Sequence, residues 1–220
     1  MRKKLVGIII PNKTDWDVIF TPLFSKGQDI AYGKTCGGIE YIAAFSGAGK
    51  VNAAVCAYSL CKDVGVEEIL SFGYAAGTNY DVHLGDIIVG DEYMYYDVAC
   101  GEGNALGQMD GCPETFASDY KAWTFLKDER HGLLATGDSI VETQTMAMAI
   151  TQTLYPDHCP LAVDMESAAI AQVCHAHEVP FTAIRIISDN PFSNERTDDA
   201  FRERKDAILQ GLFKKFLNED

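Results

Sequence analysis

Short apolar runs alternate with helical patterns along most of this 220-residue chain. The runs at residues 5–10 ("LVGIII"), 68–77 ("EILSFGYAAG") and 181–188 ("FTAIRIIS") lack the polar alternation that leaves one face of a strand in water. Residues 51–65 and 166–177 show helical spacing instead. Strands that are apolar on both faces and separated by helices are typical of α/β folds. The sequence therefore predicts a three-layer-like α/β fold, with a central mixed β-sheet wrapped by helices.

The chain is expected to form one domain over residues 1–220. Its hydrophobic content of 47% is enough for a sizeable core, and no repeat, low-complexity tract or linker divides it. The stretch from Cys100 to Ser118, rich in Gly, is the one long irregular segment. Long irregular loops often cover functional sites, so this segment is a candidate lid or contact region.

Two helices have faces that can be assigned from spacing. In the first, Val51, Val55, Tyr58 and Cys61 share one face. The charged stretches "RERKD" (202–206) and "LNED" (217–220) are expected on the wet side of the last helix. The apolar face of that helix comprises Phe201, Ile208, Leu212, Phe213 and Phe216.

Charge and composition exclude several classes of partner. The formal net charge of −14 repels the phosphates of nucleic acid and of anionic membranes, and no Lys/Arg block offsets it. The run "LVGIII" is too short for a signal peptide or a membrane span. The seven cysteines are odd in number and form no CxxC pair, which indicates reduced thiols in a cytoplasmic protein.

Two apparent motifs do not predict cofactors. "SGAGK" (46–50) resembles the end of a phosphate-binding loop, but its flanking residues do not fit. Ala44 stands where such a loop needs its first glycine, and Val51 stands where Ser or Thr would hold magnesium. His175 and His177 in "CHAH" are two residues apart on a helix and so point to different faces. We expect neither a metal nor any other cofactor.

Carboxylates stand at the ends of two predicted strands. Asp164 and Glu166 follow the run at 160–163, and Asp189 follows the run at 181–188. In open α/β sheets ligands bind beyond the carboxyl ends of the strands, so these acids can converge on a site. Spacing alone leaves an alternative open, in which the first two acids cap the next helix and Asp189 belongs to a turn.

Several motifs resemble the nucleoside phosphorylase superfamily, and most closely its methylthioadenosine/S-adenosylhomocysteine nucleosidase branch. They are "VDMESAAIAQVC" followed by "VPFTAIRIISD", and, in the family's order, "GIII", "SGAGKVNAA", "GYAAGTNYDVHLGDIIVGDE", "GQMDGCPETF" and "TGDSIV". The resemblance implies a nucleoside substrate and no cofactor. It also implies a homodimer in which a partner loop closes the pocket for the 5′ substituent, with residues 100–113 as a contributor.

The resemblance also implies which residues carry the chemistry. Asp189 matches the general acid that protonates N7 of the leaving adenine, and Ser188 and Arg185 match neighbours that orient it. Asp15 matches the carboxylate that activates the attacking water, in preference to Asp17. If a helix begins here, these two acids point about 200° apart, so only one of them can face the sugar.

Substrate contacts follow from the same motifs. Glu166 matches the carboxylate that binds the ribose hydroxyls, and Met165 packs beneath the sugar. Backbone groups at Val141 contact the purine, and Ile140 stands where many relatives have a stacking aromatic ring. The remaining positions expected to line the substrate site are Asp164, Tyr74 and Ala75.

Two positions depart from the family pattern. Asp15 is one methylene shorter than the family's glutamate, and Tyr74 replaces a small serine that helps to hold the water. The segment "YYDVACGEGNALG" also replaces a loop that bears aromatic residues around the 5′ substituent. The preferred 5′ group therefore stays open.

Three functions remain. The first is hydrolysis of the N-ribosidic bond of an adenine nucleoside such as methylthioadenosine, S-adenosylhomocysteine or 5′-deoxyadenosine. In this reaction one carboxylic acid protonates the leaving adenine and one carboxylate activates the attacking water. The second is phosphorolysis, for which the chain offers no arginine near the expected anion site, although Lys13 and Lys50 are conceivable substitutes. The third is a catalytically weak nucleoside-binding protein, because of the changes at Asp15 and Tyr74.

Overall fold

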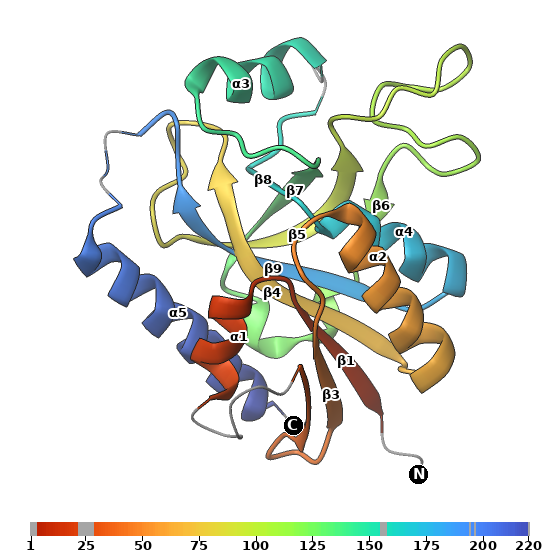
Figure 1. The fold of residues 1–220 in the computed structure, drawn as a ribbon, viewed down its shortest axis with the longest axis vertical. Coiled ribbons are helices and arrows are strands. Elements are labelled where there is room, and N and C mark those ends of the chain that lie inside the picture. Colours follow the sequence, from red (N-terminus) through yellow and green to blue (C-terminus); the bar gives the residue numbers. More distant parts are fainter. Residues whose placement is uncertain (1–3, 22–28, 155–157, 194, 196, 220) are drawn as a thin grey trace.

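The computed structural model describes residues 4–21, 29–154, 158–193, 195 and 197–219, and contains one mixed β-sheet with helices on both sides (Figure 1). The strands are β1 (Leu5–Ile10), β2 (Ile30–Lys34), β3 (Glu40–Phe45), β4 (Glu68–Gly77), β5 (Ile87–Tyr95), β6 (Phe116–Ala117), β7 (Arg130–Thr136), β8 (Ala162–Asp164) and β9 (Phe181–Asp189). The α-helices are α1 (Lys13–Phe20), α2 (Lys50–Ser59), α3 (Gln144–Met148), α4 (Ser167–His177) and α5 (Asp199–Leu217). Single helical turns of other types are η1 (Leu60–Val64), η2 (Tyr120–Ala122), η3 (Thr124–Leu126) and η4 (Ala149–Leu154).

The sheet is mixed, as the sequence predicts, but part of it closes on itself. Strands run in the order β2-β3-β1-β4-β8-β7-β5-β6, and β9 bridges β4 and β5. A ring of pairings therefore connects β4, β9, β5, β7 and β8 and returns to β4. The sheet continues beyond this ring from β4 to β1 and β3. Strand β1 is parallel to both β3 and β4, so the carboxyl ends of the three strands lie at the same edge.

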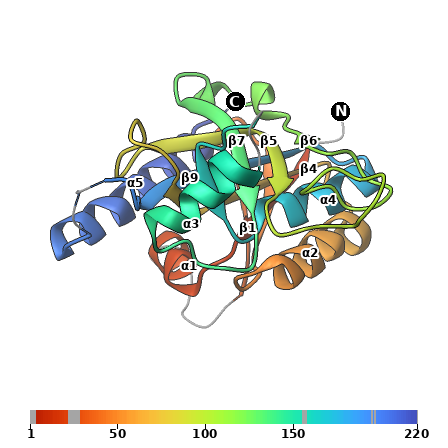
Figure 2. The same cartoon turned by 90° about the horizontal axis from the view of Figure 1, so that it is seen from above.

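Helices cover the two faces of the sheet, which confirms the predicted three-layer arrangement. On one side α2 packs against α4, and on the other α1 packs against α5 (Figures 1 and 2). Small residues such as Ala53, Ala57 and Ala168 allow the first pair to lie close to the strands. Aromatic residues such as Trp16 and Phe213 fill the core under the second pair.

The last helix shows the predicted apolar face but contradicts part of the predicted wet side. Arg202, Glu203 and Arg204 are exposed, whereas Lys205 and Asp206 are half-buried because they turn toward the sheet. In "LNED", Glu219 is buried, because its Oε1 accepts hydrogen bonds from the backbone N and the Oγ1 of Thr124 at 2.8 Å each. The spacing of charges along a helix does not reveal such long-range partners. The predicted apolar residues Phe201, Leu212, Phe213 and Phe216 are buried, and Ile208 is partly buried.

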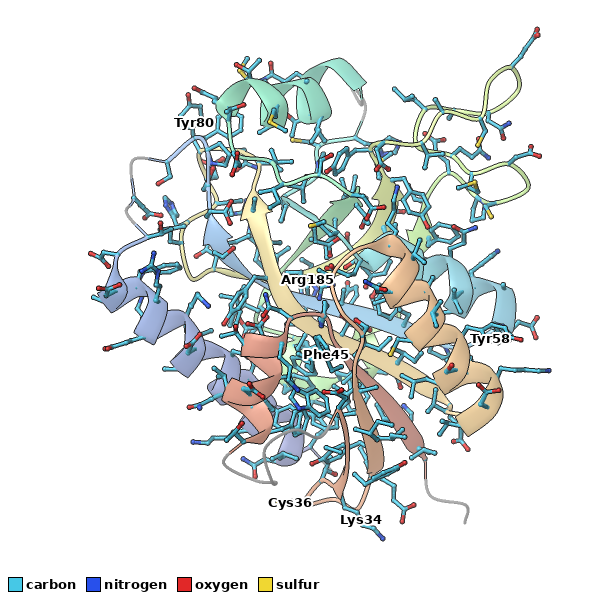
Figure 3. All side chains as sticks on the ribbon, viewed as in Figure 1. Lys34, Cys36, Phe45, Tyr58, Tyr80 and Arg185 are labelled. Atoms are coloured by element: carbon cyan, nitrogen blue, oxygen red, sulfur yellow. The ribbon has the colours of Figure 1, made fainter. Side chains whose placement is uncertain are left out.

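The outward side of α2 carries the face predicted for the first helix. Val51, Val55 and Tyr58 are 74%, 62% and 48% exposed, so this face is not part of the core. Figure 3 labels Tyr58 at the outer edge of the molecule. Residues 100–118 are irregular, as predicted, until they reach the short strand β6 (Figure 1). Strand β2 had no counterpart in the sequence-based prediction. None of the helices in the described ranges has the length and apolarity needed to cross a membrane.

Candidate active site

A cavity of about 190 Å³ lies where the carboxyl ends of β1, β4, β8 and β9 meet the loops after β3 and β7. Ten of the eleven site residues predicted from the sequence line it, and Arg185 lies directly behind its wall. They come from segments that are distant in the sequence. The ten are Asp15, Tyr74, Ala75, Ile140, Val141, Asp164, Met165, Glu166, Ser188 and Asp189.

Asp189 reaches the cavity through an irregularity at the end of β9. The β4–β9 register shifts so that Ala75 pairs with Ile187 and Ala76 with Asp189, which leaves Ser188 as an extra residue. A bulge of this kind re-aims consecutive side chains, and here both Ser188 and Asp189 line the cavity. Ser188 Oγ donates to Asp189 Oδ1 at 2.6 Å. Burial raises the pKa of Asp189, the Ser188 hydrogen bond lowers it, and the Glu142 charge raises it.

Asp15 enters the cavity from the first turn of α1. The helix begins after Asn12, whose Oδ1 accepts from the backbone N of Thr14 at 2.8 Å. Asp15 is 2% exposed, while Asp17 is on the outer side of α1 at 3.9 Å from Lys13 Nζ. Of the two acids, Asp15 lines the cavity and Asp17 does not, which is the arrangement needed for Asp15 to face a bound sugar.

The carboxylate of Asp15 is buried, and its hydrogen-bonding capacity is not fully satisfied by the described residues. Its Oδ2 has no hydrogen-bond partner within the described part of the chain. Burial raises the pKa of Asp15 to about 7, and among the nearby charges Lys205 has the largest effect and opposes this rise. A group with this pKa exchanges protons near neutral pH, which suits a general base.

Glu166 stands at the start of α4 but does not cap it. Its side chain makes no capping hydrogen bond and instead accepts from the backbone N of Gly49 at 2.8 Å. Gly49 has φ 94°, a conformation that favours glycine, so the "SGAGK" turn presents this N–H to the carboxylate. Burial raises the pKa of Glu166 to about 7, and the Asp164 charge adds to the rise.

Asp164 takes the capping role that spacing alone left open for either acid. Its Oδ1 accepts from the backbone N of Ser167 at 3.1 Å and from Thr136 Oγ1 at 2.6 Å, and its Oδ2 accepts from Arg185 Nε at 2.7 Å and from Ser167 Oγ. Both carboxylate oxygens are thus occupied by the protein. Asp164 lines the cavity, but its contacts make it a support for neighbouring groups rather than a free ligand for substrate.

Arg185 is completely buried, and Figure 3 places it near the centre of the molecule. Besides its ion pair with Asp164, its Nη1 donates to the backbone O of Ser71 at 3.1 Å and to that of Ile184 at 3.2 Å. Its Nη2 has no partner among the described residues. The resemblance implies that both Arg185 and Ser188 orient Asp189. In the structure Ser188 contacts Asp189, whereas the hydrogen bonds of Arg185 go to other residues.

Tyr74 forms part of the cavity wall and is held from α5. Its hydroxyl donates to Asp206 Oδ1 at 3.2 Å, and Lys205 Nζ lies 3.9 Å from the centre of its ring. Burial raises the pKa of Tyr74 well above its usual value, and the charges of Asp15 and Asp206 raise it further. The tyrosine is therefore neutral and retains a hydroxyl that can donate and accept.

The mouth of the cavity is apolar. Ile140 is 67% exposed, and Val141 is buried beside it. The sequence had missed seven lining residues, of which Ala48 lies in "SGAGK" and Ser139 in "TGDSIV", two motifs already quoted for the resemblance. The others are Pro11, Asn12, Gly73, Ala76 and Val163, which flank predicted site residues or strand ends.

Neither lysine considered as a phosphate ligand lines the cavity. Lys13 Nζ lies 2.7 Å from Asp29 Oδ1 on the outside of α1. Lys50 Nζ lies 2.8 Å from each oxygen of Asp97. His175 and His177 contact different rings, those of Phe116 and Tyr58, and no cluster of metal-binding side chains occurs in the described ranges.

Comparisons with known proteins agree with this geometry. Residues 19–218 match the family model of the phosphorylase superfamily, and the chain belongs to this superfamily. A 5′-methylthioadenosine/S-adenosylhomocysteine nucleosidase of Bacillus thuringiensis subsp. konkukian is 35% identical over 179 residues, which cover 76% of this chain and 72% of that protein. One of Hydrogenovibrio crunogenus is 36% identical over 161 residues, covering 69% and 68%.

A solved structure shows the same fold. The S-adenosylhomocysteine nucleosidase of Streptococcus pyogenes, in complex with 5-methylthiotubericidin, superposes with a TM-score of 0.79 at 28% identity, over 99% of this chain and 98% of that one. The fold class and the resemblance to the nucleosidase branch, both predicted from sequence motifs, are confirmed.

Proposed function

We propose that this chain hydrolyses the N-ribosidic bond of adenine nucleosides of the methylthioadenosine, S-adenosylhomocysteine or 5′-deoxyadenosine type. The observation that carries the proposal is the convergence of Asp15, Glu166 and Asp189 on one cavity. Burial raises the pKa of each of the three. The purine nucleosidase predicted from the sequence is also the activity named for the curated relatives.

The proposed reaction needs an acid for the base and a carboxylate for the water. Asp189 gives its proton to N7 of adenine while the bond from N9 to C1′ breaks and its electron pair passes to the purine. Water attacks C1′ of the cationic sugar, forms the new C–O bond, and gives its proton to Asp15. A protonated Asp189 and an ionised Asp15 are thus required together, and the raised pKa of Asp189 favours the first requirement.

Glu166, whose Oε1 accepts from the backbone N of Gly49, is proposed to bind the ribose hydroxyls through its carboxylate. This contact fixes the sugar and places negative charge near the developing cation. Met165 and the apolar pair Ile140 and Val141 line the same cavity, where they provide surfaces for the sugar and the purine.

Water is favoured over phosphate as the nucleophile. A phosphate dianion needs cationic partners, and Lys13 and Lys50 are engaged with carboxylates outside the cavity. Arg185, the arginine that lies next to the cavity among the described residues, already pairs with Asp164. The curated relatives reported above are likewise named nucleosidases, which also disfavours a protein that only binds nucleosides.

The test is to incubate the protein with methylthioadenosine, with and without phosphate, and to identify the products. We expect adenine and free 5-methylthioribose at equal rates in both buffers. Formation of a sugar 1-phosphate would contradict hydrolysis. Binding of the nucleoside without release of adenine would support the non-catalytic alternative. S-Adenosylhomocysteine and 5′-deoxyadenosine, assayed in parallel, define the preferred 5′ group.

We also propose that the chain acts as a homodimer through the α2–α4 side. Val51, Val55 and Tyr58 form an exposed apolar face of α2. The face adjoins a groove of about 440 Å³. Met109, within residues 100–113, and Val98, just before them, line this groove. The face is close to the active site along the chain, because α2 begins directly after Gly49, the donor to Glu166. A second copy seated here would bring its own loop near the sugar end.

Sedimentation at micromolar concentration tests the dimer. We expect the parent to sediment as a dimer and a Val55→Glu variant to dissociate, because a charge in an apolar contact is costly. Lys62→Glu, at an exposed position in the turn η1 that follows α2, is the charge control and should leave the dimer intact. A monomeric parent would contradict the proposal. We also propose a cytoplasmic location, which the odd number of cysteines without a CxxC pair favours.

A further inference from the structure

Helix α5 supplies two charged side chains to the back of the active-site wall. Lys205 Nζ and Asp206 Oδ1 are 3.1 Å apart, and their side chains are only 18% and 35% exposed. Both contact Tyr74, Asp206 through its hydroxyl and Lys205 through its ring face. A residue that lines the cavity is therefore held on its far side by a pair of opposite charges.

The charges of the same pair also act on Asp15, which lines the same cavity as Tyr74. Four charged groups act on its carboxylate: Lys205 and Asp206 from α5, Arg185 from β9, and Glu166 from the start of α4. On α1 itself, Lys13 and Asp17 lie outside, and Lys13 pairs with both Asp17 and Asp29. Tyr74, from β4, is neutral. The balance of charge around Asp15 thus depends on α5 as much as on the residues of the pocket motifs.

Lys205 influences the charge of Asp15 without forming an ion pair with its carboxylate among the described contacts. Its ammonium group lies over the Tyr74 ring and pairs with Asp206, and within the described ranges Asp15 Oδ2 keeps no partner. A direct ion pair would hold the carboxylate oxygen that has to accept a proton from water. A cation held nearby by another anion and an aromatic face favours the ionised carboxylate and leaves its oxygen free.

We infer that Lys205 and Asp206 are positioning residues for the hydrolysis: Asp206 fixes the Tyr74 hydroxyl at the cavity wall, and Lys205 supplies the cation that opposes the burial of the Asp15 charge. The inference rests on the proposed role of Asp15 as the base. It also accounts for the shorter acid at this position, because Tyr74 and its two partners fill the wall beside Asp15.

The two charges should have opposite effects on the pKa of Asp15. Burial raises this pKa to about 7, Lys205 lowers it, and Asp206 raises it. Activity requires the ionised carboxylate, so it falls as the pH drops through this pKa. Removing Lys205 should therefore move the acidic limb of the pH profile upward, and removing the charge of Asp206 should move it downward. A purely structural contact would not give shifts of opposite sign.

The experiment compares Lys205→Met and Asp206→Asn with two matched controls on the same helix, Lys214→Met and Glu203→Gln, whose parent side chains are exposed. We measure the pH dependence of kcat/KM for adenine release. The carboxyl carbon of Asp15 is titrated separately by ¹³C NMR in ¹³C-aspartate-labelled protein and assigned with Asp15→Asn.

We expect opposite shifts of about half a pH unit or more in the two test variants, and much smaller shifts in the controls, since partly buried charges are less screened than exposed ones. Shifts of the same sign, or shifts no larger than in the controls, would overturn the inference. Failure of the parent to release adenine would contradict the proposed function instead. The NMR titration would still decide whether α5 sets the charge state of Asp15.

Discussion

Asp164 and Asp15 are both buried carboxylates at the edge of one cavity, yet their surroundings are opposite. Asp164 has an ion-pair partner and donors for both oxygens, supplied by Arg185, Thr136 and Ser167. Among the described residues, Asp15 Oδ2 has no hydrogen-bond partner, and the charges of Lys205 and Arg185 only partly oppose the effect of burial. A saturated buried charge supports the fold, whereas an unsatisfied one is costly to bury and is retained where chemistry needs it.

The largest effect on turnover is expected at the acid. Asp189→Asn removes the proton donor for N7 while preserving shape, so kcat should fall at least about 100-fold with little change in binding of a nucleoside analogue. Parallel measurements of adenine release and analogue affinity test this. Turnover at the parent level would exclude Asp189 from the acid role.

The largest effect on stability is expected at the buried ion pair of Arg185 and Asp164. Arg185→Met leaves the Asp164 charge buried without its partner, which costs about 3–5 kcal/mol of unfolding free energy. Denaturant titration measures this loss. Arg130→Met is a useful control, because the side chain of Arg130 is exposed and donates to the backbone O of Asp81. Equal stabilities of the two variants would refute the supporting role of the pair.

A smaller effect is expected at Tyr74. Tyr74→Phe removes the hydroxyl that donates to Asp206 but keeps the ring beneath Lys205. We expect roughly a tenfold loss of kcat with nucleoside affinity nearly intact, because the wall beside the attacking water loses one polar group. A larger rise in KM than fall in kcat would instead identify Tyr74 as a substrate contact.

The sequence predicted most of the site because its residues lie in strand-end motifs. Asp189 and Glu166 follow recognisable apolar runs, and Asp15 lies just after the first strand. The motifs could not show which acid is saturated, since the partners of Asp164 come from β7, α4 and β9. They also gave no sign of Asp206, which meets Tyr74 across 132 residues.

The fold shows the same division. Apolar runs predicted most of the strands but not β2. The closure of the sheet depends on β9 pairing with both β4 and β5, and an apolar run carries no information on such pairing. Charges on α5 looked solvated because helical spacing reports only which residues share a face. Whether that face meets water or the wall of a site is decided by tertiary packing.

The most direct test of the contrast between the two carboxylates is the behaviour of Asp15→Asn. Between the unfolded pKa near 3.8 and the folded pKa of about 7, the folded state holds a proton at Asp15 that the unfolded state has lost. Stability therefore falls as the pH rises through this window, and at pH 8 the parent bears the full cost of a buried charge.

Measured at pH 8, Asp15→Asn should lose adenine release and gain at least about 1 kcal/mol of unfolding free energy. In a chain of this size that gain corresponds to about 2–4 °C in Tm. The gain should shrink toward pH 4, where the parent carboxyl is protonated in the folded state. A variant that keeps the parent rate, or one that is less stable than the parent at pH 8, would contradict the assignment of Asp15 as the poised base.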